Sequence, residues 1–575
     1  MLQSSRVGMA QPISKRPDMT NRKTLLLFVL AAPFLGAGPA AALECDVDTA
    51  AAFDLPGVTV TAAVPAEDGA AACLVSGTVI TQGGDAPDGA ARFEIRLPEA
   101  WNGRFAMLGN GGLAGRVRAS ANHADIAYAN ATGYVTAMTD LGHEAESSVD
   151  ARFALLPDGT PDDAAIADYY HRATHVVTQT AKAMATAAYG HAPQRSYLTG
   201  CSTGGRMAQV AATRYPDDFD GVISGTPFMD ISSMLKIQHF QINQLLSPDA
   251  QILPEKLPAI QAAVMQACDG IDGTVDGLVQ MPAACSFAPE TMICPGADDA
   301  ACISAAQAKA LRAYFTALHT DDGQLVFPGY APVLFDDGFS NFQGGKEPAA
   351  DVTAAEPWGN DGFAPAPIEW SFSDHIIQYL VKHDPSFNVR DLGISPDGTV
   401  PRPVVEEFIA RTAAGNGSDL AATQAFLDAG KKMILYHGWG DHALSPFRTT
   451  RFVDDLARRE GGMQALSAKA RLFMVPDMGH CRGGTGPDAF NTLAALEAWV
   501  EQGIAPDALA AEKLDDSGAV TRSMPLCPYP ARAEYSGTGD VTQAANWSCT
   551  ANTALLQMGS VGISAGLLTG GEPTQ

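Results

Sequence analysis

The hydrophobic and polar positions of this chain follow strand-like and helix-like patterns in two stretches that a long interruption separates. Apolar runs or regular alternation predict strands over 93–97, 104–108, 134–139, 195–199, 221–225, 433–436 and 472–475. Helical spacing predicts helices over 164–189, 205–215 and 490–502. From about 226 to 431 this order is lost, and prolines, cysteines and aromatic residues are frequent. The pattern indicates an α/β sheet with a large insertion.

The length of the chain supports this division. Its 575 residues exceed the roughly 100–200 residues of an ordinary single domain. We therefore expect a catalytic sheet domain built from residues 43–225 and 432–575, and a lid domain formed by residues 226–431. The sequence gives no indication of the oligomeric state.

The first 42 residues have the order of a secretory signal peptide. Basic residues in the segment 19–23 precede an apolar run over 24–32, and small residues at 40–42 offer a cleavage site. Met19 is an alternative start, because residues 1–18 precede the basic segment. A membrane anchor is the competing interpretation, but prolines and glycines interrupt the apolar run after residue 32. We expect a secreted or periplasmic protein with no membrane span after cleavage.

The net charge limits the possible binding partners, and the cysteine content indicates the cellular compartment. The formal net charge of −27 argues against binding to nucleic acid or to anionic membranes. All ten cysteines follow the expected cleavage point, and an even number in an exported chain indicates five disulfides. A zinc site is the alternative, but paired C-x-x-C spacing is absent.

The motif Gly-x-Ser-x-Gly centres on Ser202 and follows the predicted strand 195–199. A helix is predicted directly after it, over 205–215. This order of strand, sharp turn and helix is the nucleophile elbow of α/β-hydrolases, which presents the serine hydroxyl beside a helix N-terminus. A chance match is the alternative in a chain with 56 glycines, but the strand and helix favour a nucleophile.

Two later strands lead to a carboxylate and a histidine. The strand 433–436 is followed by Asp441, and the strand 472–475 is followed by His480. A serine needs a base to accept its proton, and the base needs an acid to orient it; in α/β-hydrolases they follow in the order Ser, acid, His. Asp441 and His480 are therefore the candidate acid and base. The neighbouring alternatives are Asp477, His437 and His442.

Two further features support a site at this edge of the sheet. The glycine-rich loop 109–115 follows a strand, where α/β-hydrolases place a second oxyanion donor, although a flexible turn would look the same. Cys201 adjoins Ser202 and Cys481 adjoins His480. If the serine and histidine meet, these cysteines lie within disulfide distance.

With these motifs assembled, the chain resembles the tannase/feruloyl esterase family, which includes mono(2-hydroxyethyl) terephthalate hydrolase. The resemblance spans nearly all of the mature chain and rests on the motifs at 139–143, 200–205, 436–441 and 478–481. It implies an α/β-hydrolase core with a large inserted lid domain. The implied catalytic triad is Ser202, Asp441 and His480, with backbone N–H groups of Thr203 and Gly112 as oxyanion-hole donors. The implied disulfides are Cys201–Cys481, Cys45–Cys73, Cys268–Cys285, Cys294–Cys302 and Cys527–Cys549.

The resemblance also implies a structural calcium ion (Ca²⁺) in the lid, within a disulfide-closed loop. The implied ligands are the side chains of Asp269, Asp272 and Asp276 and the carbonyl groups of Thr274 and Leu278. Three carboxylates interleaved with glycines suit a hard cation, although an acidic surface turn would look the same. The spacing is not that of an EF-hand.

By the same resemblance, the substrate is a small aromatic ester of the feruloyl, galloyl or terephthalate type. A catalytically silent aromatic-ligand binding protein, a peptidase and an acyltransferase are the competing hypotheses. Candidate pocket aromatics are Trp358, Trp370 and Phe372, for which core packing is an equal alternative. Asp477 occupies a position where the family often has glycine, and we expect its carboxylate to affect the pKa of the nearby His480.

Overall fold

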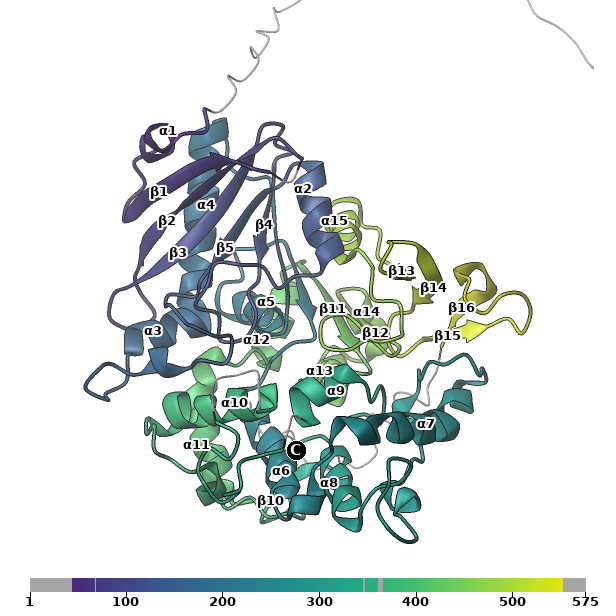
Figure 1. Cartoon of the computed structure of the whole chain (residues 1–575). Coiled ribbons are helices and arrows are strands. Elements are labelled where there is room, and N and C mark those ends of the chain that lie inside the picture. Colours follow the sequence, from purple (N-terminus) through teal and green to yellow (C-terminus); the bar gives the residue numbers. More distant parts are fainter. Residues whose placement is uncertain (1–43, 68, 345–346, 360–365, 552–575) are drawn as a thin grey trace, which may run out of the picture. The chain divides into compact units, whose positions relative to one another are not determined.

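A nine-stranded mixed sheet organises the chain, as seen in a computed structural model that describes residues 44–67, 69–344, 347–359 and 366–551 (Figure 1). The strand order is β1-β2-β3-β5-β4-β6-β7-β11-β12. The strands are β1 (Val58–Pro65), β2 (Ala72–Thr81), β3 (Gly89–Pro98), β4 (Arg104–Leu108), β5 (Val135–Thr139), β6 (Arg195–Cys201), β7 (Gly221–Gly225), β11 (Lys432–Gly438) and β12 (Ala470–Val475). The predicted signal peptide, residues 1–42, lies outside the described residues.

The sheet is antiparallel at one side and parallel at the other. β1, β2, β3 and β5 pair antiparallel in that order. From β5 onward the neighbours β4, β6, β7, β11 and β12 pair parallel. Each predicted strand is present, because the inner parallel strands are buried on both faces and read as continuous apolar runs. The sequence analysis missed β1, an edge strand in which half-buried and exposed residues alternate, and β2 beside it.

The long helix predicted over 164–189 is present as three consecutive segments. These are α3 (Asp163–Ala167), a π-helical turn (Asp168–Arg172) and α4 (Ala173–Tyr189). The π-helical turn is buried, and inside it Arg172 Nε lies 2.6 Å from Asp168 Oδ1. Because such a turn interrupts the α-helical ladder, backbone carbonyl groups in it become available to other donors.

Arg206 uses these carbonyl groups. It lies on α5 (Thr203–Arg214), the helix that follows the Ser202 turn, and is fully buried. Its guanidinium donates to the carbonyl oxygens of Tyr169 and Tyr170, each at 3.2 Å, and to that of Gly415 at 3.0 Å. The same group stacks 4.5 Å from the ring centre of Tyr169. Arg206 therefore connects the elbow helix to both the π-helical turn and the inserted segment.

The insertion between β7 and β11 is mainly helical, as Figure 1 shows in teal and green. Its longer helices are α6 (Met234–Gln244), α7 (Leu257–Cys268), α8 (Ala305–Phe315), α10 (Ile368–His375), α11 (Arg402–Thr412) and α12 (Leu420–Asp428). The described residues form one compact unit, so the limits of a separate lid domain stay a prediction. Within the described residues, no helix is both long and apolar enough to cross a bilayer.

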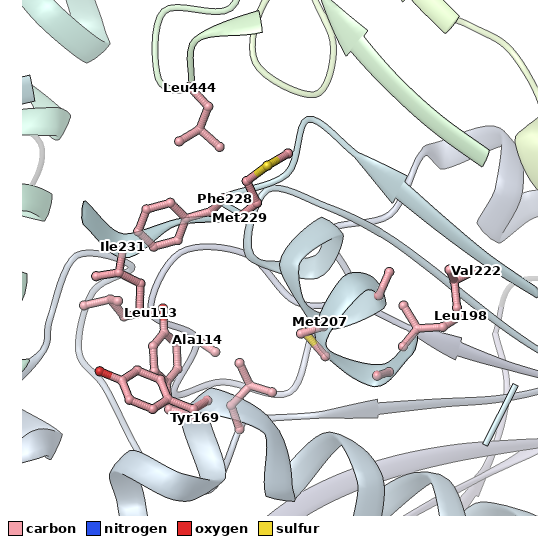
Figure 2. Packing of buried hydrophobic residues seen from close by; sticks show 14 of the residues in the cluster. Leu113, Ala114, Tyr169, Leu198, Met207, Val222, Phe228, Met229, Ile231 and Leu444 are labelled. Carbon is pink, nitrogen blue, oxygen red and sulfur yellow. The ribbon is translucent and has the colours of Figure 1, made fainter. Parts of the chain in front are cut away.

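Helix α5 is packed closely against the sheet. Met207 of this helix belongs to the same buried cluster as Leu198 of β6 and Val222 of β7, and Figure 2 shows these three side chains together. The helix can approach because glycines line the contact. A Cβ atom on Gly200 would lie 2.6 Å from the backbone carbon of Gly204. The small residues around the serine are therefore required by backbone-to-backbone packing.

We expect Gly200→Ala to destabilise the fold by about 1–3 kcal/mol, because the added methyl group meets backbone atoms that no side-chain rotation can move aside. Denaturant unfolding measures this change. Gly296→Ala is the matched control, since a Cβ atom there has no neighbour within 4 Å. Equal stability of the two variants would contradict the packing argument.

Candidate active site

Ser202 occupies the turn between β6 and α5 in a conformation that is rare for residues other than glycine. Its backbone angles are φ 63° and ψ −122°. Its N–H donates to the carbonyl of Gly225 at 3.0 Å, and its carbonyl accepts from the N–H groups of Arg206 and Phe228, each at 3.1 Å. Three backbone hydrogen bonds thus hold the strained turn that a nucleophile elbow requires.

Asp441 and His480 lie side by side on loops that follow two neighbouring parallel strands. Asp441 comes after β11 and His480 after β12. His480 Nδ1 lies 3.0 Å from Asp441 Oδ2 and 3.2 Å from Oδ1. The backbone N–H groups of Ala443 and Leu444 donate to Asp441 Oδ1 at 2.8 and 3.0 Å. The aspartate is therefore fixed behind the imidazole, in the position that orients a catalytic base.

Electrostatics favour the ionised form of Asp441. Burial by itself raises the pKa of this carboxyl, but the charges of His480 and His437 and their hydrogen bonds outweigh burial and lower the pKa below the ordinary value. Asp441 is thus an anion at neutral pH. An anion at Nδ1 stabilises the imidazolium that forms when His480 accepts a proton.

Ser202 and His480 line one cleft of about 980 Å³. Their neighbours Cys201 and Cys481 form a disulfide with the Cα atoms 5.9 Å apart. Among the contacts of the described residues, the Ser202 hydroxyl has no hydrogen bond to His480, as in many hydrolases without substrate. The structure therefore brings Ser202 and His480 to one cleft, with Asp441 buried behind His480, while their catalytic roles stay a prediction.

Of the two predicted oxyanion donors, Gly112 lines the cleft, and Thr203 is buried beside Ser202. Thr203 is the first residue of α5, so its N–H has no partner within the helix. Gly112 has φ 60° and lines the cleft, and a Cβ atom on it would lie 2.5 Å from the carbonyl oxygen of Ser148. The hydroxyl of Thr203 donates to the Gly112 carbonyl at 2.5 Å. This bond keeps the glycine-rich loop and the elbow together, as an oxyanion hole requires.

His143 contacts the backbone of the glycine-rich loop 109–115. Its Nε2 lies 2.8 Å from the carbonyl oxygen of Leu113, and its Nδ1 lies 3.2 Å from that of Leu141. The imidazole stacks on Phe153 with 3.7 Å between ring centres. Burial lowers the pKa of His143 to about 4, so the ring is neutral at neutral pH. The motif containing His143 was noted in the sequence, but this supporting role was not.

Comparison with known proteins identifies the family. The sequence matches the family described as tannase and feruloyl esterase over residues 73–550. An uncharacterized esterase of Xanthomonas campestris pv. campestris is 32% identical over 538 residues, which cover 87% of each chain. Mono(2-hydroxyethyl) terephthalate hydrolase of Piscinibacter sakaiensis is 31% identical over 507 residues, which cover 80% of this chain and 81% of that enzyme. The chain belongs to the tannase and feruloyl esterase family.

The esterase assignment confirms the resemblance seen in the motifs, and the protein is a carboxylic ester hydrolase. The fold is confirmed as well. The crystal structure of feruloyl esterase B from Aspergillus oryzae matches with a TM-score of 0.71 at 24% identity, covering 86% of this chain and 97% of that one. The fold class is thus an α/β-hydrolase core with a large inserted segment.

The neighbouring alternatives have other partners in this esterase. His437 Nδ1 lies 2.8 Å from Thr449 Oγ1, and its Nε2 lies 3.1 Å from Asp441 Oδ2, so it supports the acid from a fully buried position. His442 Nε2 contacts the carbonyl oxygen of Leu334 at 2.5 Å. Neither arrangement leaves a ring nitrogen directed at Ser202 in the described contacts.

The carboxyl group of Asp477 hydrogen-bonds to the inserted segment. Its Oδ1 accepts from the N–H of Val279 at 3.1 Å, and its Oδ2 accepts from the Thr485 hydroxyl at 3.3 Å. Burial raises the pKa of this carboxyl to about 7, helped by the nearby Asp276 and Asp269. No hydrogen bond or ion pair between Asp477 and His480 occurs among the described contacts. Its expected influence on His480 stays a prediction.

The candidate pocket aromatics divide between the cleft and the core. Phe372 lines the cleft. Trp358 and Trp370 are buried and pack edge to face with ring centres 5.1 Å apart, and neither lines the cleft. The sequence analysis missed Glu369, which lines the cleft next to Phe372. Its only signal was a lone acid in the apolar run at the start of α10.

The ten cysteines form the five disulfides that the resemblance implies. Besides Cys201–Cys481, the bonds are Cys45–Cys73, Cys268–Cys285, Cys294–Cys302 and Cys527–Cys549. No cysteine is free in the described chain. The zinc alternative therefore has no thiolate ligand available.

The predicted calcium loop follows α7. Asp269 Oδ1 accepts from the N–H of Asp276 at 3.1 Å, and Asp272 Oδ2 accepts from Gln280 Nε2 at 2.7 Å. Asp276 Oδ2 accepts from Arg522 at 2.6 Å, and its carbonyl accepts from the same guanidinium at 2.7 Å. In the described chain these carboxylates do not form a group with all ligand atoms within 4.8 Å of one another. Arg522 is thus the cation that Asp276 binds directly.

The chemistry of this loop fits a hard cation. Burial raises the pKa of Asp272 and of Asp276, and the repulsion between the acids adds to the rise at each. Calcium prefers oxygen ligands, and a bound calcium ion would offset the repulsion between these buried carboxylates. The predicted carbonyl ligands Thr274 and Leu278 lie in the same loop. The cluster Cys294, Asp298 and Cys302 does not compete, because its sulfur atoms form a disulfide.

We expect His143→Asn to make stability less sensitive to acid. A histidine whose pKa is lowered from 6.5 to about 4 by folding contributes stability above about pH 6.5 that is lost as pH falls toward 4, by at most about 3 kcal/mol. Denaturant unfolding at several pH values measures the slope. The variant should lose less stability than the native chain over this range, and identical slopes would contradict the argument.

Proposed function

We propose that this esterase hydrolyses esters of aromatic carboxylic acids through an acyl-enzyme on Ser202. The observation that carries the proposal is the composition of the cleft. Phe228, Phe342 and Phe372 line it together with Ser202 and His480. Phe228 and Phe372 pack edge to face at 5.6 Å, and Phe342 packs against the imidazole of His480 at 5.4 Å. Aromatic walls beside a nucleophile suit an aromatic acyl group.

Each member of the triad then has a defined task. The Ser202 oxygen forms a bond to the ester carbonyl carbon while its proton passes to His480 Nε2. The carbonyl oxygen becomes an anion that the N–H groups of Thr203 and Gly112 stabilise. The C–O bond to the alcohol breaks, and the alcohol leaves with the proton from His480. Water then attacks the acyl-enzyme by the same route and releases the acid.

The described residues on the inserted side of the cleft offer no cationic side chain to a carboxylate on the acyl group. The cationic side chains on the cleft are Arg118, Arg482 and Lys513, and all three belong to the sheet domain. In contrast, the described lining residues of the inserted segment include the acids Asp336 and Glu369 and no lysine or arginine. A feruloyl or galloyl group, which carries no second carboxylate, fits this aromatic side without cations. A terephthalate monoester, which carries a second carboxylate on its acyl half, is the alternative substrate.

We expect the purified protein to hydrolyse methyl ferulate or methyl gallate faster than a terephthalate monoester. Ser202→Ala should lower kcat at least about 10³-fold, because the nucleophile is lost. Pre-steady-state experiments with substrate in excess should show a burst of alcohol release before steady-state turnover, provided that hydrolysis of the acyl-enzyme is the slower step. Turnover that persists in Ser202→Ala would contradict the acyl-enzyme mechanism. Binding of aromatic esters without any turnover would favour the silent binding protein.

We also propose that the protein is exported and binds calcium. Five disulfides support export, because disulfides persist in oxidising compartments. The buried acids of the loop 269–278 support calcium binding. When bound, calcium would neutralise Asp269, Asp272 and Asp276 and stabilise the inserted segment.

Removal of calcium with a chelator should therefore lower the Tm by several degrees. A calcium concentration about a hundred times the Kd contributes about 3 kcal/mol of stability. Asp272→Asn should show a lower Tm that no longer responds to the chelator, and added magnesium should not replace calcium. A native protein whose Tm ignores both chelator and calcium would exclude the site.

A further inference from the structure

Two buried side chains of the inserted segment bind the loop that carries Asp441. Tyr330 and Gln343 are 2% and 0% exposed. The hydroxyl of Tyr330 donates to the carbonyl oxygen of Ala443 at 2.9 Å, and Gln343 Nε2 donates to the carbonyl oxygen of His442 at 2.5 Å. Neither side chain is among the described lining residues of the cleft. Any effect of these two bonds on the reaction must therefore pass through the loop.

The two carbonyl groups belong to the peptide groups that hold Asp441. The carbonyl of His442 shares its peptide group with the N–H of Ala443, and the carbonyl of Ala443 shares its own with the N–H of Leu444. These two N–H groups are the donors to Asp441 Oδ1, at 2.8 and 3.0 Å. Both peptide groups are trans, and a trans peptide is planar with its C=O and N–H in opposite directions. A hydrogen bond that fixes each carbonyl oxygen thus fixes the N–H that faces the carboxylate.

The amide of Gln343 is held in the orientation that this contact needs. Its Oε1 accepts from Gln241 Nε2 at 2.9 Å, which leaves its own Nε2 to face the His442 carbonyl. Gln244 Nε2 donates to the backbone carbonyl of Gln343 at 2.9 Å. Gln241 and Gln244 lie on α6 and are buried, although glutamine is mostly an exposed residue. These glutamines of α6 therefore hold Gln343 in place.

Tyr330 is fixed on its own side of the loop. Its ring stacks on that of Tyr314 with 4.5 Å between ring centres. The carbonyl of its neighbour Gly329 accepts from the Ser445 hydroxyl at 2.6 Å, so the insertion and the loop bond in both directions. Burial raises the pKa of Tyr330 well above its ordinary value, so the hydroxyl keeps its proton. It therefore acts as a donor to the Ala443 carbonyl at neutral pH.

We propose that Tyr330 and Gln343 are positioning residues that hold Asp441 through its two peptide donors. This assignment rests on the proposed function, because it requires Asp441 to orient His480. Fixed donors keep the carboxylate from rotating away from the imidazole. A hydrogen bond to a carbonyl oxygen also polarises the N–H of the same peptide group, which strengthens its bond to the carboxylate. The inserted segment thus contributes to catalysis as well as forming one wall of the cleft.

The test follows hydrolysis of 4-nitrophenyl acetate, a small ester that does not require the aromatic wall of the cleft. Tyr330→Phe removes one oxygen atom and keeps the ring. We expect kcat to fall about tenfold while KM changes less than about twofold, as for the loss of one buried hydrogen bond that acts on the reaction and not on substrate binding. Gln343→Met keeps the length of the side chain but has no donor, and it should show the same split.

The Asp441→Ala background separates positioning from a merely structural role. In that background Tyr330→Phe should change kcat less than about twofold, because the group through which it acts is gone. The rate of Ser202→Ala is subtracted as background, since loss of the acid costs less activity than loss of the nucleophile. An equal loss of kcat in the native and Asp441→Ala backgrounds would overturn the assignment.

Tyr314→Phe is the matched control, because it removes a buried hydroxyl from the stacked partner of Tyr330. That hydroxyl lies 3.1 Å from His442 Nδ1 and contacts no peptide group of the loop among the described contacts. Its loss should leave kcat within about twofold of the native value. If Gln343→Met does not fold, Tyr330→Phe decides.

The remaining outcomes distinguish this assignment from the proposed function. A native kcat in folded Tyr330→Phe, or a loss that appears only in KM, would overturn the positioning role. A native kcat in Asp441→Ala would refute the proposed triad and the positioning role with it. Turnover of 4-nitrophenyl acetate without turnover of aromatic esters would refute the proposed substrate class alone.

Discussion

Close backbone packing at the nucleophile turn is the constraint on which the other features of the site depend. Helix α5 approaches β6 so closely that Gly200 and Gly204 leave no room for a Cβ atom between them. This approach places the N-terminus of α5 beside the Ser202 hydroxyl and the glycine-rich loop beside both. The hydrogen bond from the Thr203 hydroxyl to the Gly112 carbonyl and the disulfide next to Ser202 lie at this same turn.

Much of the fold and the central site could be predicted because their signals are local. Ser202 lies in a short motif between a strand and a helix, and Asp441 and His480 each follow a buried parallel strand. Chain order alone then places them at one edge of the sheet. The disulfide between Cys201 and Cys481 could be inferred for the same reason, because each cysteine adjoins a catalytic candidate.

The remaining features depend on contacts between distant segments. Glu369 lies in a helical insertion whose position over the site no periodic pattern reveals. Asp477 is three residues from His480 in sequence, yet its carboxylate binds Val279 of the insertion. The partner of Asp276 is Arg522, 246 residues later in the chain. Such pairings arise from tertiary packing, which explains why local sequence signals could not supply them.

The contacts of Arg206 limit how the inserted segment can differ among proteins with this core. Its guanidinium is fully buried and donates to three backbone carbonyl groups, two before the elbow and one in the insertion, and it stacks on the ring of Tyr169. A backbone acceptor cannot be supplied by exchanging side chains; it requires the right chain path. If the insertion were replaced by that of a relative, the new chain would need a backbone carbonyl at the position of Gly415. Without it, the buried guanidinium of Arg206 on α5 would lose a hydrogen-bond acceptor. The chain path at Gly415 would therefore limit which insertions this core accepts.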